Sequence, residues 1–505
     1  MDSRSPRSSL ARLALAIVAV VAGAIVLNGC GSGGSGKPHA EASFVVSGAP
    51  VGNPVPSGFV GLSMEIKALA QYAGTDPTAV NPVLLHLIED IAPGQSPVLR
   101  LGGDSTDWSW WPVPHVARPP GVRFTLTPNW MDVAHSLATA VRGRLILGVD
   151  LEADNRTIAA AEARAMVTRI GKSAIDALEL GNEPELYGSF GWYTSVTGRP
   201  VRGRPRSYDP PAFYRDFSSF APQLPDVRLA GPSSGAPTWL AQLGGFLSAE
   251  PRVRLVTVHA YPLKHCRKAT VVTIPQLLSE QSSHGLAASV APYVAVASAH
   301  HDPVRVDEMN GITCGGTRGV SDTFASALWM LDTLFEMART GVGGVNVQTV
   351  AGTLQEVLGP EHDSSGWHMR VHPEYYGMMM FAQAAPSGSR LLKLGTAAPA
   401  GVKVWATRAA DGATHVVVIN KRLAGSQFLR LRVAGAHGAA GVEQLRAPSV
   451  HATGGVTLGG QTFGAQTATG VLAGPAARRT VTASGGAYPV TVPAASATML
   501  TIPAG

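Results

Sequence analysis

Short apolar runs rich in β-branched residues alternate with longer segments of helical periodicity from about residue 57 to residue 385. The eight predicted strands are 58–63, 98–101, 144–149, 175–180, 227–230, 254–259, 304–307 and 344–349. The helices predicted between and after them include 80–91, 130–142, 158–170, 211–221, 238–247, 274–299, 321–340 and 372–384.

This regular alternation predicts an α/β fold with parallel strands, because a parallel crossover needs an intervening segment that packs back on the sheet. Eight repeats over about 330 residues are typical of a closed (β/α)8 TIM barrel, which we expect for residues 57–385. A doubly wound open sheet is the alternative. Against it, no Gly-x-Gly-x-x-Gly follows the first predicted strand, where the common nucleotide-binding fingerprint of that architecture would lie.

The pattern changes after about residue 386, where short alternating runs are separated by Gly, Ala and Pro. Such runs are typical of a β-sandwich, and we expect one over residues 386–505. Residues 42–46 have the same character, so the segment 42–56 is a candidate strand of that domain.

Composition limits the class of protein and its partners. Of 505 residues, 45% are hydrophobic and 15% are charged, which indicates a globular chain long enough for one large and one smaller domain. The net charge is +6, and no run of Lys and Arg is interleaved with aromatic residues. We therefore do not expect nucleic acid as a partner.

The N-terminus has the pattern of an export signal. Arg4, Arg7 and Arg12 precede an apolar run of about 15 residues, shorter than the roughly 20 that a transmembrane helix needs, and the run ends in Leu27-Asn28-Gly29-Cys30. This ending resembles the bacterial lipobox, which implies a signal peptide over 1–30, a lipidated Cys30 and anchoring to the outer face of the membrane. We expect residues 31–41 to form a flexible tether, because they are rich in Gly and Ser. An ordinary secreted protein cleaved nearby is the alternative.

Two further cysteines, Cys266 and Cys314, are predicted to form a disulfide, because free thiols would be exposed to oxidation in an exported protein. A zinc site is the weaker interpretation. Neither cysteine has a Cys or His partner at the two- to four-residue spacing of structural zinc sites, although His265 is adjacent.

Two glutamates follow predicted strands that face each other across the barrel. Glu183 follows the fourth strand and Glu308 follows the seventh. Active sites of these barrels lie at the carboxyl ends of the strands, so both side chains can flank one bond of a substrate. Glycosidases that retain anomeric configuration hold their two carboxyl groups about 5–5.5 Å apart, whereas inverting enzymes hold them about 6.5–9.5 Å apart.

Four motifs resemble those of glycoside hydrolase family 79, the heparanase and β-glucuronidase family of the clan A retaining glycosidases. They are Arg100-Leu101-Gly102-Gly103-Asp104-Ser105, Gly181-Asn182-Glu183-Pro184-Glu185, His259-Ala260-Tyr261-Pro262 and Asp307-Glu308-Met309-Asn310. The resemblance covers both the barrel and the trailing β-domain. It implies that Glu183 is the general acid/base and Glu308 the nucleophile, that Tyr261 hydrogen-bonds the nucleophile, and that Asn182 contacts the sugar 2-hydroxyl.

Other residues are candidates for orienting charge or binding sugar. Arg100 would supply the positive field that keeps Glu308 ionised, and Asp104 lies in the same motif. We expect Asp307 to face outward, because neighbouring residues of a strand point to opposite sides, and Glu185 to line the cleft or bind a neighbouring backbone group. Candidate aromatic platforms are Trp108, Trp110, Trp111, Tyr187, Tyr193, Trp367, Tyr375 and Tyr376. Candidate donors to a uronate carboxylate are His368, Arg370 and Tyr375.

The sequence thus predicts a retaining hydrolase that cleaves a β-glycoside, with a β-D-glucuronide as the expected substrate. The carbohydrate and the membrane, through the lipid anchor, are the expected partners. No cofactor or metal is expected, and the sequence holds no Cys-x-x-Cys pair. Glucoside or xyloside specificity is one alternative. A non-catalytic, carbohydrate-binding surface lipoprotein is the other.

Overall fold

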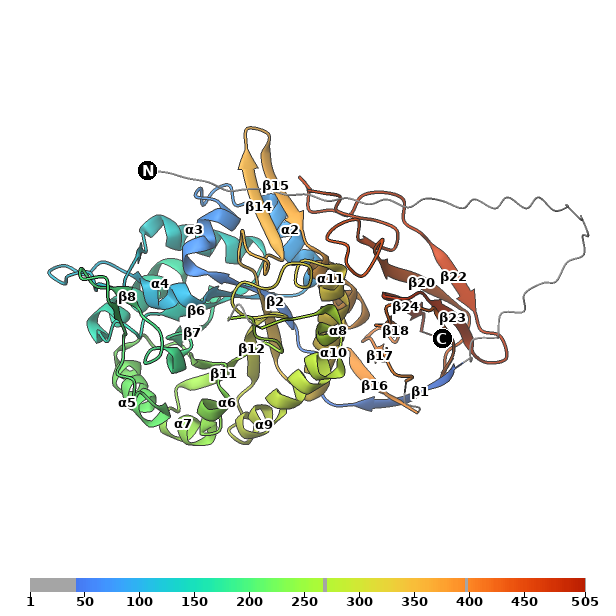
Figure 1. Cartoon of the computed structure of the whole chain (residues 1–505), viewed down its shortest axis with the longest axis horizontal. Coiled ribbons are helices and arrows are strands. Elements are labelled where there is room, and N and C mark those ends of the chain that lie inside the picture. Colours follow the sequence, from blue (N-terminus) through green and yellow to red (C-terminus); the bar gives the residue numbers. More distant parts are fainter. Residues whose placement is uncertain (1–41, 267–269, 396–397, 505) are drawn as a thin grey trace, which may run out of the picture. The chain divides into compact units, whose positions relative to one another are not determined.

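The computed structural model describes residues 42–266, 270–395 and 398–504, and these contain a closed parallel barrel. Its strands are β2 (Val60–Glu65), β3 (Val98–Gly102), β6 (Arg144–Val149), β7 (Ile175–Leu180), β10 (Leu229–Ser234), β11 (Val253–Ala260), β12 (Val304–Met309) and β13 (Gly344–Gln348). They pair in this order, and β13 closes on β2 (Figure 1). The predicted TIM barrel is confirmed, because each predicted strand overlaps one barrel strand.

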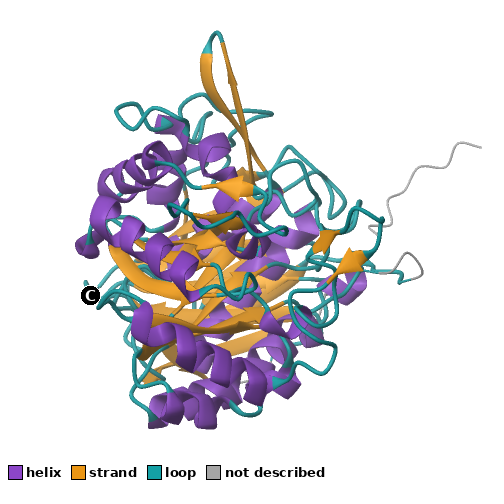
Figure 2. Cartoon of the chain, turned by 90° about the vertical axis from the view of Figure 1, so that its left-hand side faces the viewer, coloured by secondary structure: helices purple, strands orange, loops and turns teal. Residues whose placement is uncertain are grey.

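The helices cover the outside of the barrel strands (Figure 2). They are α2 (Pro82–Ile91), α3 (Pro128–Ala140), α4 (Arg156–Ile170), α5 (Pro210–Phe220), α6 (Pro237–Leu240), α7 (Leu243–Ala249), α8 (Ile274–Leu277), α9 (Leu286–Ala299), α10 (Phe324–Thr340) and α11 (Pro373–Ala384). The side chains of Asn81, Asn155 and Asp209 cap the starts of α2, α4 and α5, which fixes where these helices begin.

Two predicted helices are interrupted in the structure. The segment predicted as 238–247 forms α6 and α7, and the segment 274–299 forms α8 and α9 with a π-helical turn, Gln281–Gly285, before α9. Trp329 of α10 donates from its indole nitrogen to the Ser282 carbonyl at 2.8 Å. This bond gives a backbone group of the irregular turn a partner outside its own helix.

The trailing domain is one hydrogen-bonded sheet of ten strands. These are β1 (Ala42–Val51), β16 (Arg390–Leu394), β17 (Val402–Arg408), β18 (Thr414–Asn420), β19 (Gln427–Val433), β20 (Ala439–Arg446), β21 (Thr457–Leu458), β22 (Arg479–Thr482), β23 (Tyr488–Val492) and β24 (Ser496–Ile502). β1 lies between β16 and β19, and β23 also contacts β18 and β24, so the sheet folds over its own apolar core.

The barrel and the β-domain share buried contacts through α10. Lys421 Nζ lies 2.5 Å from Asp332 Oδ2, Trp405 donates to Asp332 Oδ1 at 2.8 Å, and the Trp405 ring stacks on Phe335 with centroids 5.3 Å apart. Asp332 is fully buried, so its charge depends on these partners from the β-domain.

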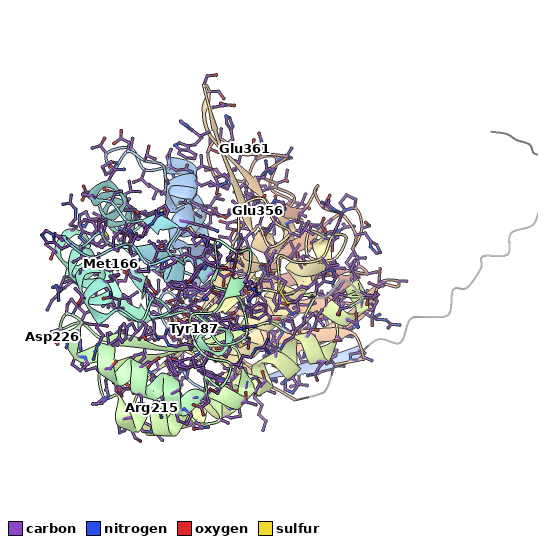
Figure 3. The ribbon with its side chains drawn as sticks, turned by 60° about the vertical axis from the view of Figure 1, so that its left-hand side comes forward. Met166, Tyr187, Arg215, Asp226, Glu356 and Glu361 are labelled. Carbon is purple, nitrogen blue, oxygen red and sulfur yellow. A yellow bond between two sulfur atoms is a disulfide. The ribbon has the colours of Figure 1, made fainter. Side chains whose placement is uncertain are left out.

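Three pairs of short strands lie in loops that follow barrel strands, and the sequence pattern did not predict them. They are β4 (Ser109–Trp110) with β5 (Phe124–Thr125), β8 (Tyr193–Thr194) with β9 (Pro200–Val201), and β14 (Leu358–Asp363) with β15 (Gly366–Val371). The first pair is parallel, and the other two are antiparallel. The last pair, here called the mouth hairpin, stands out from the rest of the chain, with Glu356 before its first strand and Glu361 on that strand (Figure 3).

The predicted signal peptide, tether and lipidated Cys30 lie outside the described residues. Within the described ranges, none of the helices combines the length and the apolar character needed to cross a bilayer.

Candidate active site

Glu183 sits just beyond the end of β7 in a strained backbone conformation. Its φ of +46° lies in the left-handed region, which a residue other than glycine adopts at a cost of roughly 1–3 kcal/mol. Its amide donates to the Ser233 carbonyl at 2.8 Å, and Pro184 begins a short 3-10 helix directly after it. These constraints hold a carboxyl group whose side chain remains 22% exposed, so solvent can reach it.

Glu308, near the end of β12, is held between two donors. Tyr261 donates from its hydroxyl to Glu308 Oε1 at 2.8 Å, and Arg100 donates from Nη1 to Oε2 at 2.7 Å. Burial would raise the pKa of Glu308, but the positive charges of His259 and Arg100 and these hydrogen bonds outweigh it and hold the pKa below its usual value. Glu308 is therefore ionised at neutral pH.

His259, at the end of β11, links the two glutamates. Its Nδ1 lies 2.9 Å from Glu183 Oε1 and 3.9 Å from Glu308 Oε2. Burial would lower the pKa of His259, but the charge of Glu308 and the hydrogen bond to Glu183 raise it to about 10. An imidazolium at neutral pH donates to Glu183 from one nitrogen and can donate to Ser233 Oγ, 3.2 Å away, from the other.

The same three residues are the group within the described ranges that could approach a metal ion. One ligand atom from each of Glu183, His259 and Glu308 lies within 4.8 Å of the others. A histidine ligand must be neutral, whereas His259 carries a proton at neutral pH. The arrangement fits acid–base chemistry better than metal binding, and the expected absence of a metal or cofactor stays a prediction.

Arg100 of β3 is fully buried beneath the glutamates. Its guanidinium contacts Glu308, donates from Nε to Glu179 Oε2 at 2.7 Å, and donates from Nη2 to Asn182 Oδ1 at 2.8 Å. Its Nε also lies 3.0 Å from Asp307 Oδ2. One cation thus orients side chains from β7, β12 and the loop that carries Glu183.

The expectation that Asp307 faces outward is wrong. Both Asp307 and Glu308 face the barrel interior, because the register of β12 shifts against β11 between Val306 and Glu308, and two successive residues on a bulged strand can then point to one side. Burial and the charge of Glu179 raise the pKa of Asp307 well above its usual value, so Asp307 keeps its proton and hydrogen-bonds Glu179. This makes Asp307 a support for the site.

Asn182 and Asp104 lie at the edge of this network. Asn182 Nδ2 approaches Asp104 Oδ1 at 3.5 Å, and burial together with the charges of Glu65 and Glu308 raises the pKa of Asp104 to about 7. The sequence reasoning missed Asp107, whose Oδ2 accepts from the Asn182 amide at 3.0 Å and from the Tyr187 hydroxyl at 2.7 Å. Asp107 therefore fixes the turn directly before Glu183. Glu185 binds a neighbouring backbone group, as predicted, because its carboxylate accepts from the Gly235 amide at 2.8 Å.

Of the predicted sugar contacts, Trp108 stays a prediction, whereas the burial of Tyr376 excludes it. Trp108 is half-buried in the 3-10 helix that carries Asp104, and Lys67 Nζ and the Arg123 guanidinium lie 4.7 Å and 4.5 Å from its ring centroid. Tyr376 is 2% exposed, and its hydroxyl accepts from the Phe463 amide at 2.9 Å. It is covered by the segment before β22, so it cannot contact a substrate.

The predicted carboxylate donors are also engaged elsewhere. Tyr375 is fully buried and donates to the Leu87 carbonyl at 2.6 Å, which removes it from the mouth. His368 and Arg370 lie on β15, where His368 contacts Ser365 and Arg370 pairs with Glu356 and Glu361.

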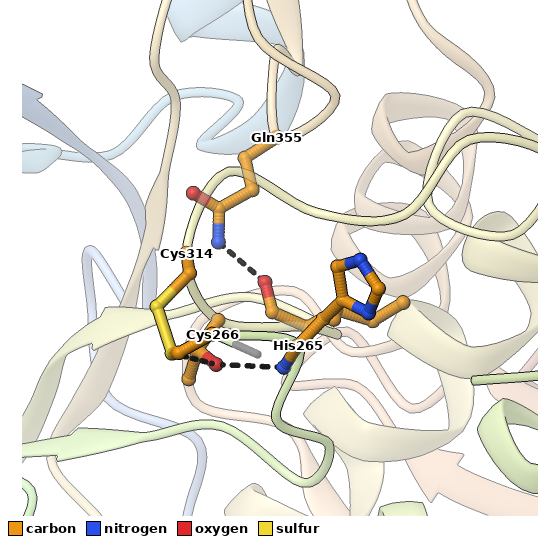
Figure 4. The surroundings of a disulfide bond; sticks show 6 residues. His265, Cys266, Cys314 and Gln355 are labelled. Carbon is orange, nitrogen blue, oxygen red and sulfur yellow. Dashed lines mark hydrogen bonds between the residues drawn. A yellow bond between two sulfur atoms is a disulfide. The ribbon is translucent and has the colours of Figure 1, made fainter. Parts of the chain in front are cut away.

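The predicted disulfide between Cys266 and Cys314 is confirmed (Figure 4). It joins the loop that begins with Tyr261 after β11 to the loop after β12, the strand that carries Glu308. Thr313 reinforces the junction by accepting from the His265 amide at 3.3 Å, and Gln355 donates to the Ile312 carbonyl. The bond therefore braces the loops that adjoin Tyr261 and Glu308.

Comparisons with known proteins concern the family of the β-domain and the fold of the chain. Residues 404–499 match the sequence model of the Glycosyl hydrolase family 79 C-terminal beta domain, whereas a search of curated protein sequences found no match.

Among solved structures, a 4-O-α-L-rhamnosyl-β-D-glucuronidase from Fusarium oxysporum 12S shares the fold at a TM-score of 0.68 and 22% identity, over 91% of this chain and 100% of that chain. The GH51 arabinofuranosidase from Xanthomonas axonopodis pv. citri follows at 0.63 and 14%, over 92% and 99%. Residues 404–499 therefore belong to the C-terminal beta domain of glycosyl hydrolase family 79, which confirms the predicted family at this domain and supports a glycosidase.

Proposed function

We propose that the protein is a retaining glycoside hydrolase that cleaves a β-D-glucuronide by double displacement. The observation that carries this proposal is the approach of Glu183 and Glu308, since one carboxylate oxygen of each lies within 4.8 Å of the other. This approach favours the short separation of retaining enzymes, about 5–5.5 Å, over the roughly 6.5–9.5 Å of inverting enzymes.

In the first step Glu308 attacks the anomeric carbon while Glu183 gives its proton to the departing glycosidic oxygen. The carbon–oxygen bond to the leaving group breaks, and a covalent ester between the sugar and Glu308 forms. Tyr261 and Arg100 favour this assignment, because their hydrogen bonds keep Glu308 ionised and fix its orientation. The hydrogen bond from His259 fixes Oε1 of Glu183, which leaves Oε2 to face the leaving group.

In the second step water attacks the same carbon. Glu183, now a carboxylate, takes a proton from that water, and the ester bond to Glu308 breaks with release of the sugar. Asn182, held by Arg100 and by Asp107, is placed to bind the sugar 2-hydroxyl.

Glucuronide specificity rests on two observations. The Fusarium neighbour is named a 4-O-α-L-rhamnosyl-β-D-glucuronidase. The two cations over the Trp108 ring, Lys67 and Arg123, offer positive charge beside the 3-10 helix that holds Asp104. A uronate carboxylate needs such charge when it leaves water. Glucoside or xyloside specificity would leave these cations without a ligand role.

Initial rates on aryl β-glucuronide, aryl β-glucoside and aryl β-xyloside test the proposal. We expect turnover of the glucuronide by the wild type and its loss in Glu308→Gln. Preference for the glucoside or xyloside would reject the specificity and keep the mechanism. Inactivity on all three, with sugar binding retained, would favour the binding lipoprotein instead.

We also propose that the protein is exported and anchored through lipid on Cys30. The Cys266–Cys314 bond supports an oxidising compartment. Mass spectrometry of the mature N-terminus tests this, since a lipidated Cys30 is expected and an unmodified N-terminus at another residue would contradict it.

A further inference from the structure

A hollow of about 530 Å³ lies beside the mouth hairpin, separate from the carboxylate pair. One wall is α1 (Leu69–Ala73) with the loop after it, and the other is the hairpin itself. The lining residues that matter here are Gln71, Gly74, Thr75, Asp76, His362 and Trp367. The walls follow β2 and β13, so this hairpin hollow opens on the same barrel face as Glu183 and Glu308.

The Trp367 ring is held in place as a flat platform. The His362 ring lies against it with centroids 4.4 Å apart, at an angle of 34°. On the other wall, a Cβ at Gly74 would come within 3.2 Å of Trp367 Cζ2, and Gly74 has a φ of +93° that other residues rarely adopt. Glycine at this position therefore lets the ring close over the end of α1 while Trp367 stays half-buried.

Polar groups of fixed geometry face the same space. Asp76 Oδ1 accepts from the amide and the hydroxyl of Thr78 at 2.8 Å and 2.7 Å, and these bonds lower the pKa of Asp76. Its carboxylate is therefore ionised and can accept hydroxyl protons, and Gln71 and Thr75 add further donors and acceptors. A held aromatic face with a few fixed polar groups at its rim is the chemistry that binds a sugar ring.

One buried hydroxyl ties both walls to the barrel. Thr349, directly after β13, lies 3.0 Å from the Tyr72 hydroxyl of α1 and accepts from the Val357 and Leu358 amides at the base of the hairpin. The β-domain braces the hairpin from outside, because Met369 and Thr467 exchange two backbone hydrogen bonds of 2.9 Å. The hollow is thus preformed on rigid elements.

The charge around the hollow favours a neutral sugar. Asp76 is the carboxylate among the lining residues, whereas Glu361 and Asp363 alternate along β14 with the lining residues Pro360 and His362. Arg370 is already paired with Glu356 and Glu361. A uronate or sulfate here would meet the Asp76 carboxylate and no unpaired arginine of the hairpin. A neutral pyranose meets only groups that accept or donate hydrogen bonds to its hydroxyls.

We propose that the hairpin hollow is a subsite for a neutral sugar unit of the glycan that the enzyme cleaves, away from the scissile bond. This inference rests on the proposed function for the identity of the glycan, but the hollow binds sugar whether or not the bond is cut. Trp367 supplies the platform, Asp76 accepts from the hydroxyls, and Gly74 leaves the room that the ring needs.

Calorimetric titration of Glu308→Gln with the β-1,4-linked tetraoses of glucose, xylose and galactose tests the subsite. At least one of them should bind, and adding Trp367→Ala should weaken it at least about tenfold, or ~1.4 kcal/mol. Trp367→Phe keeps a ring and should keep most of the binding. Phe428→Ala, which removes an exposed aromatic ring from β19 of the β-domain, is the matched control and should bind like its parent.

Three results would overturn the proposal: no binding by any neutral tetraose, equal binding after Trp367→Ala in a protein with unchanged melting temperature, or tighter binding of tetragalacturonate than of every neutral tetraose. The proposed function fails separately, through absence of aryl glycoside hydrolysis by the wild type, because the titrations need no turnover.

Discussion

Replacing Tyr261 by Phe removes one hydroxyl from the site and leaves the ring in place. That hydroxyl donates to Glu308 Oε1 at 2.8 Å, and it is one of the groups that lower the pKa of Glu308. A hydrogen bond to a charged group contributes about 1.5–3 kcal/mol, and one pKa unit corresponds to about 1.36 kcal/mol. The pKa of Glu308 should therefore rise by roughly 1–2 units in Tyr261→Phe.

The sign of the effect on activity follows from the role of Glu308. The nucleophile must be ionised, so kcat/KM falls on the acid side as Glu308 takes a proton. A higher pKa moves this acid limb to higher pH by the same roughly 1–2 units. The assay is the pH dependence of kcat/KM on an aryl β-glucuronide, which reports the pKa values of the free enzyme.

Tyr214→Phe is the matched control, because its hydroxyl donates to the Gln242 carbonyl on the outside of the barrel, at 2.9 Å. It should leave the acid limb where it is. If the limb of Tyr261→Phe stayed in place as well, or moved to lower pH, Glu308 could not be the group whose ionisation the limb reports.

Three further predictions concern the acid/base, the linking histidine and the disulfide. Glu183→Ala should keep the first step on substrates with good leaving groups, because only poor ones need a proton, and azide should restore product release; equal loss on all leaving groups and no azide rescue would reverse the assignment. The pKa of His259 is raised from 6.5 to about 10, so the stability that its charge provides is complete below pH 6.5 and is lost as pH rises to about 10. The melting temperature should fall across this pH window, and it should fall less steeply in His259→Gln. Parallel curves of melting temperature against pH for the two proteins would contradict this role of His259. Replacing Cys266 and Cys314 by Ser opens a loop with a sequence separation of 48, which should lower the free energy of unfolding in urea by about 4 kcal/mol, and an unchanged midpoint would show that the loops hold without the bond.

The barrel could be predicted from sequence because its strands are buried along their whole length. β6 and β7, for example, are continuous short runs with almost every side chain inside, and the segments between them have helical periodicity. The same reasoning found both glutamates, because polar residues directly after such strands have few places to lie except the barrel mouth.

The hydrogen-bond network around Glu183 and Glu308 could not be predicted, because it depends on backbone geometry that the pattern of apolar and polar residues does not reveal. A register shift in β12 turns Asp307 inward, and the left-handed conformation of Glu183 sets the direction of its carboxylate. His259 could have been found, since it ends a predicted strand two residues before Tyr261 and lies in one of the motifs that resemble family 79. Asp107 had no such signal, because its role depends on backbone amides brought from two other loops.

The prediction that Tyr376 contacts the substrate failed for a different reason. Nearly every residue of α11 is buried, because the barrel covers one side of the helix and the β-domain covers another. A helix that is apolar all round gives no pattern from which to choose its substrate-facing side. The mouth hairpin was missed because its outer half is exposed and polar, so it lacks the apolar run by which the barrel strands were recognised.

The most direct test of the central claim is peptide mapping by mass spectrometry after trapping the enzyme with a 2-deoxy-2-fluoro β-glucuronide that carries a good leaving group. The electron-withdrawing fluorine slows breakdown of a covalent intermediate, so a glycosyl ester should accumulate. We expect the added mass on the peptide that contains Glu308 and nowhere else. A label on Glu183 or on another residue, or turnover to a product of inverted configuration with no label, would contradict the account.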